Sequence, residues 1–320
     1  MHEPVLYQEI IHALRPRGGA CYVDCTVGAG GHAKGVLEAS SPDGKLLGFD
    51  LDPQALELAR ERLTPFGERV TLVYASYTTL RRQLDSLGWD CVDGILLDLG
   101  LSSMQLDTPE RGFSFRSDGP LDMRFDPEAK VRAADLVNHL PERELANLIY
   151  RYGEERRSRQ VARAIVAARP IHTTRALADI VDRVVRRGRS RIHPATRTFQ
   201  ALRIATNKEL DALEKILPQA IAALAPGGRL AVIAFHSLED RLVKRYFRRE
   251  SRDCICPPEQ PICTCDHRTV LRIITRKPIR PTDAETQSNP RSRSARLRIA
   301  EKLDPSTTKT TKTTKTTKTT

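Results

Sequence analysis

The chain lacks any run of about eighteen consecutive apolar residues, which is the length that a membrane-spanning helix requires. Its first residues, Met1-His2-Glu3-Pro4, also lack the basic and then apolar layout of a secretory leader. We therefore expect no membrane partner and a cytoplasmic location. Because the seven cysteines are not accompanied by an export signal, reduced thiols or metal ligands are expected rather than disulfides.

Negative charge is in short supply, with 40 acidic against 52 basic residues and a formal net charge of +12. Clustered arginines are typical of a polyanionic partner, and nucleic acid is the usual one. A generally basic proteome or solvated helix faces would be the alternative explanation. The clusters are Arg156, Arg157 and Arg159; Arg183, Arg186, Arg187, Arg189 and Arg191; Lys244, Arg245, Arg248 and Arg249; and Arg291, Arg293, Arg296 and Arg298.

The chain also has no G-x-x-x-x-G-K-[ST] phosphate loop, which argues against a nucleoside triphosphatase. It has instead a short apolar strand that runs into the glycine-rich turn Gly28–Gly31 and then into a helix. A second apolar strand follows and ends on Asp50, about twenty residues beyond the glycines. An acidic residue at this spacing suits the two hydroxyls of a ribose. The pattern predicts a pocket for an adenosine-containing cofactor.

An acidic residue, Asp24, stands just before the glycines. It would repel a pyrophosphate and attract an ammonium group, and S-adenosylmethionine carries an ammonium and no phosphate. This favours a methyltransferase over a nicotinamide-dependent dehydrogenase. A nicotinamide-dependent dehydrogenase is not excluded, because an alanine, here Ala33, is tolerated at the last glycine position of the dinucleotide-binding motif G-x-G-x-x-G. A purely structural glycine turn is the third interpretation.

Strand and helix patterns alternate through the first hundred residues, which indicates an α/β fold with a mostly parallel sheet and helices on both faces. Ligands bind such sheets beyond the carboxyl ends of the strands. The expected strands are Ala20–Asp24, Lys45–Asp50, Val70–Tyr74 and Gly94–Leu97, and the expected helices among them include Gln8–Leu14 and Pro53–Leu63.

The alternation stops at about Thr108, and only helical patterns follow until about Thr198. The sheet then resumes with a helix over Lys208–Leu224, a turn at Ala225–Gly228 and a strand over Arg229–Phe235. We therefore expect one discontinuous domain made of residues 1–107 and 199–303, with an all-helical insertion at 108–198. The tail at 304–320 is a Thr/Lys repeat with nothing apolar to bury, and is expected to be disordered. The helices expected in the insertion are Pro141–Tyr152, Ser158–Ala168 and Thr174–Arg187.

Eight segments of the chain, which include the glycine turn, match one known family. They are Gly28–His32, Asp98–Ser103, Glu110–Phe115, Asp118–Arg124, Tyr152–Arg156, His193–Ile204, Phe235–Arg241 and Asn289–Ser294. On these segments the sequence resembles the bacterial 16S ribosomal RNA cytosine-N4 methyltransferases, which are class I enzymes with a Rossmann-like sheet and use S-adenosylmethionine. The resemblance implies that the substrate is a cytosine in the decoding centre of the small ribosomal subunit.

The resemblance also implies which residues bind the cofactor. Asp50 suits the ribose hydroxyls, Tyr77 would lie against the adenine, and Asp98 and Gln105 would offer polar partners to the base or to the methionine end. An ordinary loop role is the alternative for each, and His32 would then simply cap a helix. The implied cofactor-binding residues are Gly30, Gly31, His32, Asp50, Tyr77, Asp98 and Gln105.

On the substrate side, the chain lacks the Asp/Ser-Pro-Pro-Tyr loop with which amine DNA methyltransferases hold the base. We predict that Asp98 or Asp122 is the catalytic acceptor of the N4 proton. The helical insertion is expected to bind the RNA substrate. A cytosine leaving its stack would meet Phe113, Phe115 or Phe199 unless these rings only pack in the core. The candidate phosphate contacts are Arg111, Arg124 and Arg197, with salt bridges inside the fold as the alternative. His236 is either a catalytic base or a structural hydrogen-bonding group.

Two C-x-C pairs, Cys254/Cys256 and Cys263/Cys265, lie six residues apart. Four thiolates this close are able to bind zinc tetrahedrally, although the usual spacing is C-x-x-C. A structural zinc ion and free thiols are both left open at this point.

The function that we expect is therefore N4-methylation of 16S ribosomal RNA. A methyltransferase that acts on another RNA, on DNA or on a protein amine is the nearest alternative, and a non-catalytic RNA-binding factor with this fold is the other. The sequence does not decide between naked RNA and an assembled small subunit as the partner, and the oligomeric state is unknown.

Overall fold

The computed structural model describes residues 4–185, 193–257, 259–260 and 262–307, which form two compact units. The first unit contains the chain up to Asp50, Gln54–Gly100 and the chain from Leu213 onward. The second unit contains Leu51–Pro53 and Leu101–Ala212. Most of the predicted tail and the cluster members Arg186 to Arg191 lie outside the described residues.

A seven-stranded sheet forms the centre of the first unit, in the order β3-β2-β1-β4-β5-β7-β6. The first five strands in this order are parallel, and β7 runs antiparallel to both of its neighbours. This confirms the predicted mostly parallel Rossmann-like α/β sheet. The strands are β1 (Cys21–Asp24), β2 (Lys45–Asp50), β3 (Val70–Tyr74), β4 (Val92–Asp98), β5 (Leu224–Ala234), β6 (Leu271–Ile273) and β7 (Arg296–Lys302).

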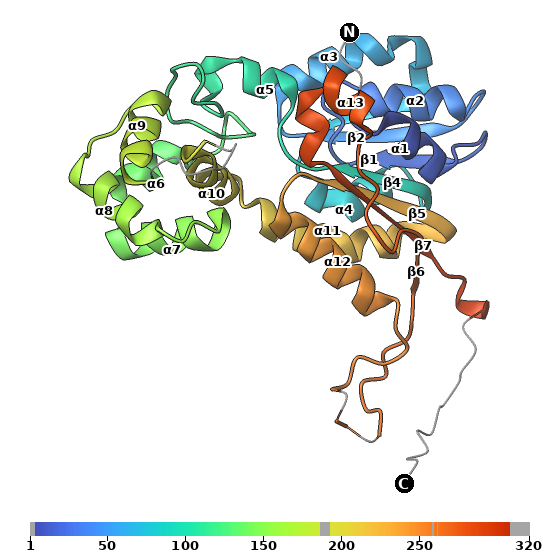
Figure 1. Cartoon of the computed structure of the whole chain (residues 1–320). Coiled ribbons are helices and arrows are strands. Elements are labelled where there is room, and N and C mark those ends of the chain that lie inside the picture. The colour runs from blue at the N-terminus through green and yellow to red at the C-terminus, as the bar shows by residue number, and fades with distance from the viewer. Residues whose placement is uncertain (1–3, 186–192, 258, 261, 308–320) are drawn as a thin grey trace. The chain divides into compact units, whose positions relative to one another are not determined.

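Helices cover both faces of this sheet, with α1, α2 and α3 over one face and α4, α11 and α12 over the other (Figure 1). Central strands such as β2 are therefore buried along almost their whole length, which explains their continuous apolar sequence. The helices are α1 (Tyr7–Leu14), α2 (Gly31–Ala39), α3 (Pro53–Leu63), α4 (Leu80–Ser86), α11 (Glu209–Ala223), α12 (Ser237–Glu250) and α13 (Asp283–Ser288).

The second unit is helical and has a core of its own. Leu145, Ile149, Val161 and Leu177 are fully buried in it, at the helical spacing that predicted these elements. The predicted helices are confirmed to within a few residues. The unit contains α5 (Ser103–Asp107), α6 (Ala133–His139), α7 (Glu142–Gly153), α8 (Ser158–Ala167), α9 (Thr174–Val184) and α10 (Ala195–Asn207).

The predicted turn at Ala225–Gly228 falls within the bounds of β5, as an irregularity of the strand. Leu224 pairs with Val92 and Arg229 pairs with Gly94, so the four residues between them have no register partner in β4. Gly227 supplies the positive φ of +78° that this irregularity needs. The Pro-Gly-Gly sequence thus interrupts the pairing locally, and the pairing of Leu224 with Val92 extends β5 in front of it.

The sequence analysis also missed β6 and β7, which close the sheet. Arg298 of β7 is buried and pairs with Asp240 of α12 at 2.7 Å. Because a buried arginine interrupts the apolar pattern expected of a strand, the sequence does not reveal β7. No helix within the described ranges combines the length and the apolar character that crossing a bilayer would take.

Candidate functional site

Carboxylates end three parallel strands of the first unit. Asp24 ends β1, Asp50 ends β2 and Asp98 ends β4, while Tyr77 follows the end of β3. Because β1 pairs with both β2 and β4, Asp24 stands between the other two carboxylates. The structure therefore brings these predicted residues to the carboxyl edge of the sheet, where open α/β sheets bind ligands.

The turn between β1 and α2 depends on glycine. Gly30 is the N-cap of α2 with φ of +78°, a conformation that side-chain-bearing residues rarely adopt. A Cβ atom on Gly31 would stand 2.5 Å from Cγ of Pro4. Since no side chain caps this end of α2, the turn presents main-chain amides at the sheet edge.

Two hydrogen bonds tie the strand ends to this turn. The amide of Gly28 donates to Oδ2 of Asp50 at 2.9 Å. The amide of Asp98 donates to Oγ1 of Thr26 at 2.7 Å. The turn that follows β1 thus holds the carboxylate at the end of β2 and the main chain at the end of β4.

Asp24 is buried, with 2% of its surface exposed. This burial raises the pKa of Asp24 to about 7, and the negative charge of Asp50 acts in the same direction. The amide of Thr26 donates to Oδ1 of Asp24 at 3.1 Å and lowers the pKa in part. Asp24 therefore titrates near neutral pH when nothing is bound.

The pKa of Asp98 is raised as well. Burial raises the pKa of Asp98 well above its usual range, and the charges of Asp24 and Glu239 add to the shift. Its Oδ1 is buried and finds no hydrogen-bond partner in the described part of the chain. Its Oδ2 lies 3.6 Å from Nδ1 of His32, whose Nε2 donates to the carbonyl of Val5 at 3.0 Å.

Burial lowers the pKa of His32 to about 4, so His32 is neutral at pH 7 and adds no positive charge. Within the described residues, no lysine or arginine forms an ion pair with Asp24 or Asp98. Burying carboxylates without a counter-charge is costly, and a bound cation would remove that cost. This edge of the sheet is built for a cationic ligand.

His236 has a structural role in the same unit. It is the N-cap of α12, and its ring accepts a hydrogen bond from the amide of Glu239. Its Nε2 lies 3.1 Å from Oε1 of Glu239, whose other oxygen accepts from the amide of Phe235. This arrangement favours the structural alternative for His236 over a catalytic base.

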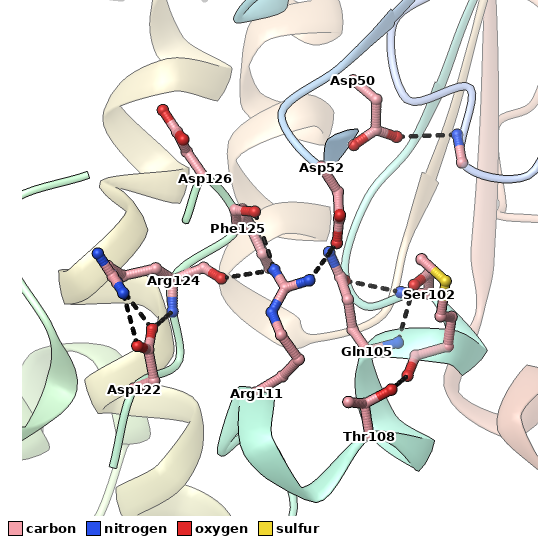
Figure 2. Close-up of polar contacts among 12 residues, drawn as sticks. Asp50, Asp52, Ser102, Gln105, Thr108, Arg111, Asp122, Arg124, Phe125 and Asp126 are labelled. Carbon is pink, nitrogen blue, oxygen red and sulfur yellow. Dashed lines mark hydrogen bonds and ion pairs between the residues drawn. The ribbon is translucent and has the colours of Figure 1, made fainter. Parts of the chain in front are cut away.

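Gln105, in the second unit, uses both ends of its side-chain amide. Its Oε1 accepts from the amide of Ser102 at 3.1 Å, and its Nε2 donates to Asp52 at 3.1 Å (Figure 2). The first bond belongs to the capping box of α5. Through these two bonds Gln105 fixes the first turn of α5 and holds the carboxylate of the fully buried Asp52.

Asp52 also pairs with Arg111, whose guanidinium donates to the carbonyls of Arg124 and Phe125 at 2.9 and 3.0 Å (Figure 2). Arg111 is mostly buried and uses its donors inside the fold, so the salt-bridge alternative holds for this predicted phosphate contact. The sequence analysis missed Asp52. The only signal would have been an aspartate two residues beyond the predicted ribose carboxylate.

Asp122 is held by Arg124 through two side-chain bonds of 2.8 and 2.7 Å and one main-chain bond (Figure 2). Burial acts to raise the pKa of Asp122, but these bonds and the charges of Arg124 and Arg132 outweigh it and hold the pKa below its usual range. A carboxylate with such a low pKa and such a close partner is a weak proton acceptor.

Core packing accounts for the three phenylalanines that the sequence offered as stacking rings. Phe113 and Phe199 are buried in the second unit's core. Phe115 packs edge to face against Phe199 with ring centroids 4.9 Å apart, and also contacts His193. Arg197 differs from the other two candidate arginines, because its side chain is 53% exposed and only reaches Glu155 at 3.5 Å.

The basic cluster of α12 lines a cavity of about 540 Å³ in the first unit. Arg245 lies 3.9 Å from Glu214 and Arg249 lies 3.4 Å from Glu250. So many cations around one hollow favour an anionic partner. The lining consists of Arg241, Lys244, Arg245, Arg248, Arg249, Arg252 and Ile255.

Comparison with known proteins adds a family and close relatives. The model of the MraW methylase family matches residues 1–303. A ribosomal RNA small subunit methyltransferase H from Geobacter sulfurreducens is 55% identical over 307 residues, which cover 94% of this chain and 99% of the relative. Proteins of the same name from Dehalococcoides mccartyi and Thermomicrobium roseum are each 53% identical, over 94% of this chain and over 86% and 94% of their own lengths.

The Asp52–Arg111 pair yields a prediction about stability. Replacing Arg111 by Met leaves the buried carboxylate of Asp52 without its counter-charge, and we expect a loss of about 3–5 kcal/mol in the free energy of unfolding. Arg60→Met is the matched control, because both side chains of its pair with Glu57 are more than half exposed and its loss should cost less than about 1 kcal/mol. Urea unfolding followed by far-ultraviolet circular dichroism measures both. Equal losses in the two variants would contradict the structural role of Arg111.

Proposed function

The chain belongs to the MraW methylase family, and we propose that it transfers the methyl group of S-adenosylmethionine to N4 of a cytosine in the decoding centre of 16S ribosomal RNA. Membership makes the chain a methyltransferase. The observation that carries the cofactor assignment is a pair of carboxyl groups, the buried Asp24 and the partly buried Asp98, with which no lysine or arginine of the described residues forms an ion pair.

S-adenosylmethionine matches this edge of the sheet in charge. Its ammonium and sulfonium groups are the cations that Asp24 and Asp98 lack, and its ribose hydroxyls suit Asp50 beside the glycine turn. A phosphate-bearing cofactor would meet two carboxylates there instead. In the proposal the turn residues Gly30 and Gly31 allow close approach, His32 lies beside Asp98, and Tyr77 lies against the adenine. Gln105 stays a predicted cofactor-binding residue.

We assign the proton-accepting role to Asp98 and not to Asp122. The bound cofactor supplies an electrophilic methyl group, and its positive charge would lower the pKa of Asp98 so that the carboxylate forms. Asp98 then accepts a hydrogen bond from the exocyclic amine, which frees the nitrogen lone pair for attack. The new N–C bond forms as the C–S bond breaks, the electron pair stays on sulfur, and the amine proton leaves to Asp98.

The RNA substrate is supported by two observations. The closely similar relatives are named for the ribosomal RNA of the small subunit. The chain has a formal charge of +12, and its α12 cations surround a cavity that suits a phosphate backbone. In the proposal the helical segment at 108–198 also contacts the RNA, and Arg197 offers it an exposed cation.

The proposal is tested by methyl transfer to small subunits from cells that lack this methylation. Purified protein and cofactor labelled in the methyl group are added to these subunits or to naked 16S ribosomal RNA, and the labelled nucleotide is mapped by mass spectrometry. We expect label on the N4 position of one cytosine in the decoding centre. Label on another RNA position, on protein or on DNA would replace the proposed substrate. Cofactor binding without transfer to any of them would favour a non-catalytic RNA-binding factor.

The choice between the two aspartates predicts a difference between two isosteric variants. Asp98→Asn removes the proton acceptor, and we expect kcat to fall by about 10²–10⁴-fold at saturating cofactor. Asp122→Asn should instead lower the thermal unfolding midpoint and leave kcat within about tenfold, because it breaks the pair with Arg124. Single-turnover methyl transfer at equal cofactor occupancy measures the effect. Full activity of Asp98→Asn would refute the assignment.

The raised pKa of Asp24 predicts how cofactor affinity depends on pH. With a pKa of about 7 in the free protein, Asp24 is protonated at pH 6 and must lose its proton to bind a cation. We expect the protonation of Asp24 to lower the affinity roughly tenfold from pH 8 to pH 6, in addition to any dependence that Asp98 contributes. Titration calorimetry in two buffers of different ionisation enthalpy should detect the released proton.

The raised pKa of Asp24 also makes the stability of the free protein depend on pH. A pKa that is raised in the folded state stabilises the free protein below the ordinary aspartate pKa, and this stabilisation is lost as the pH rises through about 7. Asp24→Asn should therefore flatten both the stability and the affinity profiles, with weaker binding at pH 8. Asp90→Asn, on an exposed loop, is the control that should keep the wild-type profiles. An unchanged profile in Asp24→Asn would show that another group titrates.

A further inference from the structure

Four cysteine thiols gather between α12 and β6 in the first unit. They are Cys254, Cys256, Cys263 and Cys265, and their Sγ atoms all lie within 4.8 Å of one another. Sγ of Cys265 is 3.6 Å from that of Cys263 and 3.9 Å from that of Cys254. The two C-x-C pairs of the sequence thus form a single cluster, although six residues separate them.

These separations are those of metal ligands. Four sulfurs bound tetrahedrally at about 2.3 Å from a zinc ion stand about 3.8 Å apart. A disulfide would instead join two sulfurs at about 2.05 Å, and all four residues are free cysteines. The cluster therefore matches an S4 tetrahedron and not a pair of disulfides.

The segment that carries the cysteines has no core of its own. None of its described residues between 251 and 270 is buried, and its large apolar side chains, Ile255, Ile262 and Val270, are 38%, 73% and 37% exposed. Ordering a backbone residue costs about 1–2 kcal/mol, and burial of apolar surface does not offset that cost here. Small elements without a core are usually held by a disulfide or a metal.

Hydrogen bonds around the cluster bring its two arms together. The amide of Val270 donates to the carbonyl of Glu250 at 2.9 Å, which closes the base of the segment where it leaves α12 and returns to β6 (Figure 1). Farther out, the amide of Ile255 donates to Sγ of Cys265 at 3.4 Å. An amide aimed at a thiolate is a common supporting contact in metal sites.

We propose that Cys254, Cys256, Cys263 and Cys265 bind one structural zinc ion. The four thiolates complete a tetrahedron, so the ion keeps no open position for catalysis. Ile255, between the first two ligands, lines the basic cavity of α12. The ion therefore fixes one wall of that cavity. This site is independent of the proposed methyl transfer, because none of its ligands belongs to the cofactor edge.

The test measures metal in the full chain, purified without a polyhistidine tag or chelator and under a phosphine reductant. Mass spectrometry of the metals should give about one zinc per chain. The double variant Cys263→Ser/Cys265→Ser should retain less than about a tenth of an equivalent. Cys91→Ser, which removes an exposed cysteine outside the cluster, is the matched control and should keep the full equivalent.

A second measurement does not depend on the folding of a variant. Zinc is removed from the wild-type protein and replaced by Co²⁺, and the visible spectrum should show the intense bands of a tetrahedral tetrathiolate. Three outcomes would overturn the proposal: wild-type protein that takes up no zinc under reducing conditions, a full equivalent in the double variant, or stoichiometric iron in place of zinc. Loss of metal without loss of methyl transfer would leave the proposal intact, since the site is structural.

Discussion

The burial of carboxyl groups without a counter-cation is the constraint on which the rest of the site depends. Asp24 and Asp98 end neighbouring parallel strands, and the pKa values of both are raised by burial. Thr26 in the turn after β1 supports this arrangement, because its amide donates to the carboxylate of Asp24 and its hydroxyl accepts from the amide of Asp98, and the neighbouring His32 stays neutral. A ligand with two positive groups would offset the cost of burying these carboxylates, and this would favour its binding.

The second unit follows the opposite principle, because its buried charges are paired. Arg111 satisfies Asp52 and two carbonyls, and Arg124 satisfies Asp122, so these groups hold the chain and are poor candidates for proton transfer. The contrast between the two kinds of carboxylate separates roles that sequence motifs alone do not distinguish. An aspartate that pairs with an arginine has a structural role, whereas an aspartate without a basic partner in the described chain is a candidate for binding or catalysis.

Basic residues likewise divide into two groups. Arg298 and Arg296 pair with Asp240 and help to attach β7 to α12, so part of the arginine excess is used within the fold. The cations on the exposed side of α12 surround a cavity next to the cysteine segment. In the proposals made above, RNA contacts the second group, and a zinc ion shapes the wall beside it.

The sequence by itself determined the five parallel strands of the sheet, the glycine turn and the strand-end carboxylates, because local patterns of apolar residues, glycines and acids specify them. It determined α7, α8 and α9 of the second unit for the same reason. Only the tertiary structure decided that Pro226 and the glycines after it lie within β5, that Arg298 is a core residue, and that Asp52 is the partner of Arg111. These outcomes depend on contacts between distant segments, and whether a charge is paired or left alone cannot be read from the order of residues.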